Sequence, residues 1–148
     1  MRPPLHAAIS VSGGVVIGWW FHSVFAGFAF IVGGVFYDVD HFLDYYVANK
    51  KISLRYRDWV HYCETNYTGR LLLIFHSYEF LILLWAMLYY YGSNFVGVSL
   101  ALGITIHFFC DQFYNPLKPM AYFFVYRMCY RFKRNLLFKD GYFEKIHS

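Results

Sequence analysis

The sequence predicts an all-α fold, an integral membrane four-helix bundle with a short amphipathic, interfacial helix near its C-terminal end. Of the 148 residues, 59% are hydrophobic and 24% are aromatic. Only 15% are charged, whereas a soluble domain usually has about 25% charged residues. Because long apolar runs dominate the chain, we expect residues 1–148 to form a single membrane domain.

Four apolar runs are predicted to cross the membrane, at residues 5–21, 24–43, 71–91 and 95–114. Each can span a hydrocarbon core of roughly 30 Å, although the first is barely long enough. The first two runs are rich in glycine, which would let their helices approach closely. The links near Ser23 and at residues 92–94 are short, and this predicts two tight helical hairpins.

The remaining segments are polar or basic. Residues 47–70 are predicted to form a loop between the hairpins. Pro116 and Pro119 end the last run, because proline cannot continue a helix. Residues 121–138 are dense in aromatic side chains and have three arginines at helical spacing, so we expect an amphipathic helix lying in the membrane interface. These arginines are Arg127, Arg131 and Arg134.

The distribution of basic residues predicts the orientation in the membrane. All 13 Lys and Arg residues fall on one side of the four-span arrangement. By the positive-inside rule, both termini and the long loop are expected in the cytoplasm. The net charge of +4 would then contact anionic lipid headgroups. Since such residues flank membrane segments in general, they do not indicate nucleic-acid binding.

Ionisable side chains interrupt the apolar runs, where they are costly to bury without a partner or a metal. Measured from the predicted cytoplasmic ends, they lie at similar depths in all four runs. Several are spaced i, i+3 or i, i+4 and would share a helix face, as metal ligands do in helical bundles. The residues concerned are His6, Asp38, Asp40, His41, His76, Glu79, His107 and Asp111.

This pattern predicts a divalent metal site. Imidazole and carboxylate ligands suit zinc best, with manganese or iron as alternatives. The expected ligands are His6, Asp38, His41, His76, His107 and Asp111. They exceed the four that one tetrahedral zinc needs, so either two ions bind or the surplus carboxylates orient the histidines. A carboxylate near the metal would accept a proton from water, and Glu79 or Asp40 is expected in this catalytic role.

The three cysteines show no CxxC spacing, so they predict neither a disulfide framework nor a thiolate zinc site. The chain also lacks an HExxH motif, a P-loop and a GxSxG motif. Metal-binding histidines and carboxylates are therefore the main chemical feature of the sequence.

The order of these residues resembles a known family. A histidine near the N-terminus is followed by Asp-x-Asp-His, then His-Ser, then His-x-x-x-Asp. This arrangement is similar to the small bacterial LexA-binding, inner-membrane-associated metal-dependent hydrolases. The likeness covers residues 5–115, and Tyr37 stands where the family often has proline, as in a divergent member. The family pattern falls on His6, Asp38, Asp40, His41, His76, His107 and Asp111.

The resemblance implies a multi-pass protein of the bacterial inner membrane that hydrolyses its substrate with a metal. A more distant similarity to zinc-dependent phospholipase C and P1-type nucleases favours a phosphoester in a lipid or other amphiphile as the substrate. Arg70 in the loop could then steady its anionic group. Two alternatives stay open: a metal-binding membrane protein without catalysis, and a structural adaptor whose buried histidine–carboxylate network only fixes helix packing.

Overall fold

The computed structural model describes residues 3–51, 53, 55, 57–58, 61–62 and 69–142. This part of the chain forms helices and two isolated β-bridges but no strand, which confirms the all-α prediction. It divides into two compact units. Unit 1 contains Met1–Asp38 and Glu79–Asn115, and unit 2 contains Val39–Tyr78 and Pro116–Ser148.

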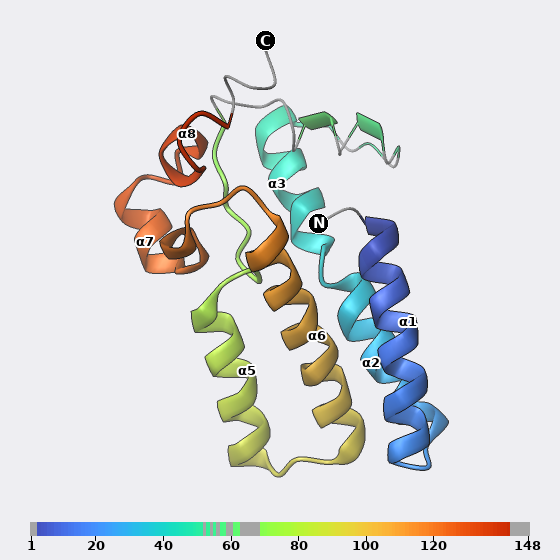
Figure 1. Cartoon of the computed structure of the whole chain (residues 1–148). Helices are drawn as coiled ribbons and strands as arrows, with labels where there is room; N and C mark the ends of the chain where they lie inside the picture. Colours follow the sequence, from blue (N-terminus) through green and yellow to red (C-terminus); the bar gives the residue numbers. More distant parts are fainter. Residues whose placement is uncertain are drawn as a thin grey trace. The chain divides into compact units, whose positions relative to one another are not determined.

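Unit 1 is built from long apolar helices. Helices α1 (Pro3–Trp20), α2 (Val24–Phe36) and α6 (Phe95–Tyr114) lie side by side, and α5 (Tyr78–Tyr91) precedes α6 (Figure 1). Capping side chains set two of the helix starts. The Ser23 hydroxyl accepts a hydrogen bond from the Ala26 amide at 3.3 Å, and the Asn94 side chain accepts one from the Gly97 amide at 2.8 Å.

Glycines allow these helices to approach closely. A methyl group added at Gly27 of α2 would lie 2.6 Å from the Gly14 carbonyl oxygen of α1. A methyl group at Gly103 of α6 would overlap the Phe30 carbonyl oxygen of α2. Larger residues would separate the backbones, so this is the close packing expected of the glycine-rich runs.

A turn at Tyr37 and Asp38 interrupts the second predicted run. The chain leaves α2 at Phe36 and begins α3 (Val39–Asn49) immediately after the turn. The run predicted over residues 24–43 is thus divided between two helices, although Val24–Asn49 as a whole is long and apolar enough to cross a membrane. Asp40 lies in the first turn of α3, where a negative charge stabilises a helix N-terminus.

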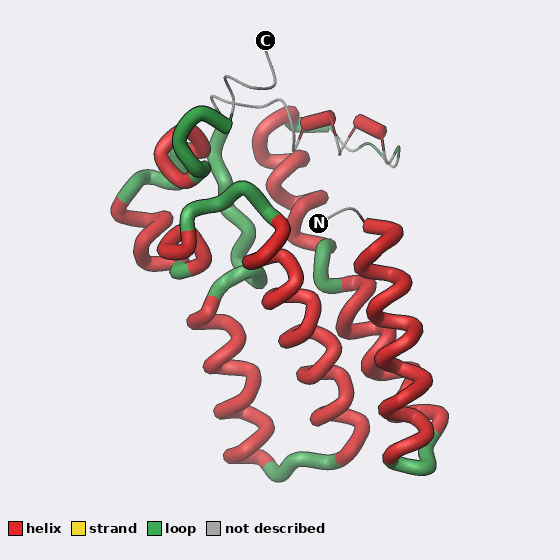
Figure 2. The backbone as a smooth tube through the Cα atoms, in the orientation of Figure 1, coloured by secondary structure: helices red, strands yellow, loops and turns green. Residues whose placement is uncertain are grey.

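The third predicted run is helical only from Tyr78 onward, and residues 71–77 form a loop (Figure 2). The cause is that carboxylates take the backbone donors of this segment. Asp44 accepts from the Leu72 amide at 2.9 Å, and Asp40 accepts from the Phe75 amide at 3.1 Å. The helix expected over residues 71–91 is thus shorter, and His76 does not share a helix face with Glu79.

The C-terminal segment is not one amphipathic helix. It contains a 3-10 helix, η1 (Pro119–Tyr122), followed by α7 (Phe124–Cys129) and α8 (Arg134–Leu137). Residues 130–133 separate α7 from α8, and residues 131 and 132 among them have φ values of 53° and 60°. Arg127 and Arg134 are only 1% and 2% exposed, so the predicted stripe of arginines facing lipid headgroups was wrong.

Two stretches of the described chain, Val24–Asn49 and Phe95–Tyr114, are long and apolar enough to cross a membrane. The first contains α2, the turn and α3, and the second is α6. In α1, large apolar side chains are exposed, among them Trp19 at 72% and Val15 at 66%. Length and composition fit the predicted membrane association for these two stretches, and the four-span arrangement stays a prediction.

We expect Gly103→Ala to lower the free energy of unfolding by about 1–3 kcal/mol, because the added methyl group would force α2 and α6 apart. Chemical denaturation of the purified protein measures this loss. Gly97→Ala is the control on the same helix, since its methyl group would meet only side chains, Leu88 at 3.0 Å and Asn94 at 3.5 Å. Equal losses in both variants would contradict the role of Gly103 in helix contact.

Candidate metal-binding sites

His107 is the central residue of a buried group in unit 1. It lies in α6 and is 2% exposed. Its Nδ1 atom is 2.6 Å from the Gly34 carbonyl oxygen of α2. Its Nε2 atom is 3.2 Å from Asp38 Oδ1 and 3.6 Å from Asp111 Oδ2. One ring nitrogen therefore contacts the backbone and the other faces two carboxylates.

The Gly34 carbonyl determines what Nε2 can do. A carbonyl oxygen only accepts hydrogen bonds, so the Nδ1–H group of His107 donates to it. In the neutral imidazole, Nε2 then has a lone pair, and this lone pair would face two carboxylate oxygens. Such an arrangement is repulsive unless a proton or a metal cation lies between the three atoms.

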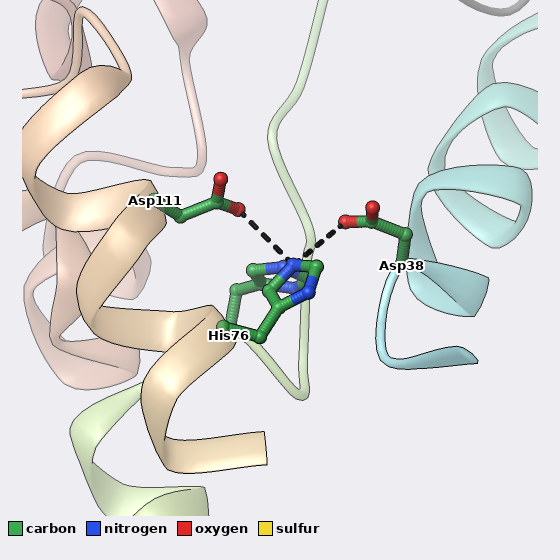
Figure 3. Close-up of side chains that lie close together, drawn as sticks. Asp38, His76 and Asp111 are labelled. Carbon is green, nitrogen blue, oxygen red and sulfur yellow. Dashed lines mark hydrogen bonds and ion pairs between the residues drawn. The ribbon is translucent and has the colours of Figure 1, made fainter. Parts of the chain in front are cut away.

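The distances among these atoms suit a shared metal ion. Zinc binds imidazole and carboxylate ligands at roughly 2.0–2.2 Å, so donor atoms on one ion lie roughly 3–3.6 Å apart. Asp38, His107 and Asp111 can each offer one donor atom within 4.8 Å of the others. Figure 3 shows the carboxylates of Asp38 and Asp111 pointing toward one another, from the turn after α2 and from α6. These three residues form what we term the unit 1 group.

His6 supports the unit 1 group from α1. Its Nε2 atom is 2.8 Å from Asp111 Oδ1, the oxygen that does not face His107. Its ring stacks on the His107 ring with 3.8 Å between centroids and 13° between planes. His6 was predicted as a metal ligand, and the structure places it where it orients the Asp111 carboxylate, as outer residues around metal sites do.

The charges of this region favour a divalent cation. Asp38 and Asp111 bring two negative charges beside two imidazoles, and both imidazoles are buried. Protonating both histidines would balance the charge, but it would stack two cations 3.8 Å apart. A divalent ion would supply the same two positive charges without two stacked cations, so this group could hold one.

Unit 2 contains a second group, formed by Asp40, His41 and His76, whose donor atoms also lie within 4.8 Å of one another. Asp40 Oδ1 is 2.9 Å from His76 Nδ1. The His41 and His76 rings meet edge to face with centroids 5.0 Å apart. This unit 2 group therefore has two imidazoles and one carboxylate, which is a donor set that zinc also accepts.

The backbone around His76 is fixed from two sides. The Phe75 and His76 amides donate to Asp40 Oδ2 at 3.1 and 3.3 Å. On the other side, Arg127 donates from Nη1 to the Leu73 carbonyl at 2.8 Å and from Nη2 to the His76 carbonyl at 3.0 Å. Leu73 has a φ of 28°, an uncommon value for leucine, so the loop needs these bonds to keep its shape.

Asp44 and Arg134 hold the preceding part of the same loop. Asp44 is 2% exposed and receives the Leu72 amide, with the Tyr62 hydroxyl at 3.4 Å. Arg134 lies 3.8 Å from Asp44 and its amide donates to the Gly69 carbonyl at 3.1 Å. The role of Asp44 had one signal in the sequence. Asp44 follows Asp40 by four residues, so the two carboxylates share a face of α3.

The predicted site residues thus separate into sets. Asp38, His107 and Asp111 come together in unit 1 with His6 beside them, and His41 and His76 come together in unit 2. Asp40, predicted as a proton acceptor, lies with the second set. Glu79 is half-buried in the first turn of α5 and belongs to neither group. Arg70 is exposed, and its backbone pairs with Lys133.

Comparisons of the chain with protein-family models, with curated proteins and with solved structures gave no match. The resemblance to the LexA-binding membrane hydrolases therefore stays a prediction. Any functional conclusion depends on the two groups of histidines and carboxylates.

We expect Arg127→Met to lower the free energy of unfolding by about 1–3 kcal/mol, because two buried carbonyl oxygens would lose their donors. Arg131→Met is the matched control, since Arg131 is exposed. Denaturation curves for both variants measure the difference. If Arg127→Met matched the control, the guanidinium would not be holding the loop that contains His76.

Proposed function

We propose that this protein is a membrane-bound, metal-dependent hydrolase that acts on phosphoesters of lipids or other amphiphiles at the cytoplasmic leaflet. One observation carries the proposal: the Gly34 carbonyl binds Nδ1 of His107 and leaves Nε2 facing Asp38 and Asp111. Around zinc, a histidine commonly donates one ring N–H to a protein carbonyl, while its other ring nitrogen faces the metal.

In the proposed site, Asp38, His107 and Asp111 hold one divalent ion, with His6 orienting Asp111. Asp40, His41 and His76 are the candidate ligands of a second ion. Zinc is the ion we propose, because both groups combine imidazole and carboxylate and neither contains cysteine. When bound, such an ion makes a water molecule more acidic and polarises a phosphoryl oxygen.

Glu79 is the better candidate for the proton acceptor. Asp40 already accepts hydrogen bonds from two backbone amides and the His76 ring, and it is a candidate ligand of the second ion, so its oxygens have other roles. Glu79 belongs to unit 1, which also contains Asp38, His107 and Asp111. In the proposed reaction a water oxygen bonds to phosphorus, the phosphorus–oxygen ester bond breaks, and the proton passes through Glu79 to the departing alcohol.

The proposed location is the bacterial inner membrane, crossed four times, with both termini in the cytoplasm. Its support is the pair of stretches long and apolar enough to span, together with the exposed apolar side chains of α1. The confinement of Lys and Arg to one side of the predicted four-span arrangement supports the orientation. In that setting an amphiphile reaches the site from the lipid phase.

We predict that His107→Ala removes bound metal and lowers hydrolysis of bis(p-nitrophenyl) phosphate by more than about 100-fold. Elemental analysis after purification without chelators gives the metal content, and release of p-nitrophenol gives the rate. His22→Asn is the control, because His22 is exposed in the turn after α1 and asparagine tolerates its φ of 48°.

Three outcomes of this experiment differ in meaning. Activity that persists after the metal is lost would overturn the proposed mechanism. Less than one metal equivalent in the wild-type protein would overturn both metal proposals. A His107→Ala variant that is merely less stable, with no metal in either protein, would support a structural network instead.

We predict that Glu79→Gln keeps the wild-type metal content but lowers kcat by about 10²- to 10⁴-fold, because glutamine cannot accept the proton. The same elemental analysis and p-nitrophenol assay separate the two effects. Unchanged kcat would remove Glu79 from the proposed reaction, whereas lost metal would make it a ligand or a support for one.

A further inference from the structure

An apolar groove runs along the outside of unit 1. Its volume is about 580 Å³, and α1, α2 and α6 all contribute to its wall. Ile9, Val16 and Ile17 come from α1, Phe30 from α2, and Ile106 from α6. Ser12 is the one residue with a polar side chain among those that line it. Such a surface suits a hydrocarbon chain and offers little to a polar ligand.

Along the axes of α1 and α6, one end of the groove lies at the level of His6 and His107, although neither histidine lines it. On α1 its last residue toward the N-terminus is Ala8, two residues after His6. On α6 its last residue toward the C-terminus is Ile106, directly before His107. From Ala8 to Ile17 the helix rises about 14 Å, so the groove extends away from the site for several methylene groups.

The occupant must also suit the surroundings of the groove. Val16, on its rim, is 59% exposed, and the neighbouring Val15, Trp19 and Trp20 are 66%, 72% and 70% exposed. Exposed apolar side chains of this kind favour contact with lipid chains over contact with water. A chain entering from the lipid phase would therefore lie along the groove with its polar end toward His6 and His107.

We propose that this groove holds the acyl chain of the amphiphilic phosphoester and places the ester beside Asp38, His107 and Asp111. This inference rests on the proposed function and adds a substrate class to it, namely phosphoesters with one extended hydrocarbon chain. In this proposal the groove selects the chain by length, and the ion that Asp38, His107 and Asp111 would hold would bind the phosphoryl oxygens.

Alkylphosphonates test the groove without any hydrolysis, because their carbon–phosphorus bond is not an ester. We would measure the Kd of butyl-, octyl- and dodecylphosphonate for the zinc-loaded protein in lipid nanodiscs, relative to the free aqueous concentration of each probe. Each added methylene that enters the groove should lower Kd by about fourfold. This comparison gives the wild-type dependence on chain length.

Three variants then distinguish binding in the groove from binding in the surrounding lipid. Val16→Trp fills the end far from the site, so it should weaken dodecylphosphonate by more than about tenfold while butylphosphonate binds as before. Val15→Trp is the matched control, an exposed neighbour that does not line the groove. Ala8→Trp, at the end beside His6, should weaken octyl- and dodecylphosphonate alike.

The results distinguish the two proposals. If Val16→Trp and Val15→Trp have the same effect on dodecylphosphonate, the chain lies in bulk lipid and the groove assignment is overturned, although the hydrolase proposal stands. If butylphosphonate does not bind the zinc-loaded wild-type protein, the proposed site itself fails. Loss of dodecylphosphonate binding in Val16→Trp alone would support the groove.

Discussion

The hydrogen bond between His107 Nδ1 and the Gly34 carbonyl is the interaction on which the rest of unit 1 depends. It joins α6 to α2 inside the bundle and fixes which ring nitrogen faces Asp38 and Asp111. It forms only because glycines bring the helices close, for a side chain at Gly103 would overlap the Phe30 carbonyl. The packing of small residues and the orientation of His107 therefore depend on each other. If the helices moved apart, the His107–Gly34 hydrogen bond would break, and Nε2 would no longer be fixed as the nitrogen that faces the carboxylates.

The sequence predicted α6 in full, because its run of 20 mainly apolar residues ends before a proline. It also placed His107 and Asp111 on one face correctly, since i, i+4 spacing acts within a single helix. The start of α5 could not be predicted from the local sequence. Residues 71–77 are apolar enough for a helix, but Asp40 and Asp44 capture their amides from 28 to 36 residues away.

The arginines of the C-terminal segment show the same limit. Their spacing of four and three residues predicted one face of an amphipathic helix in the membrane interface, and a buried guanidinium is rare without partners. Arg127 is buried because the Leu73 and His76 carbonyls, which no helix satisfies, need its donors. The non-helical loop thus needs the buried arginine as a donor, and the arginine needs the loop carbonyls as acceptors. Neither feature can be predicted from the local sequence alone, because the two partners lie more than 50 residues apart.

Asp38 and Asp40 are two residues apart, yet they serve different histidines. Asp38 ends unit 1 and faces His107, while Asp40 begins unit 2 and binds His76. The turn at Tyr37 and Asp38 lies where unit 1 ends and unit 2 begins. One short Asp-x-Asp-His motif therefore supplies a carboxylate to each group, Asp38 to His107 and Asp40 to His76.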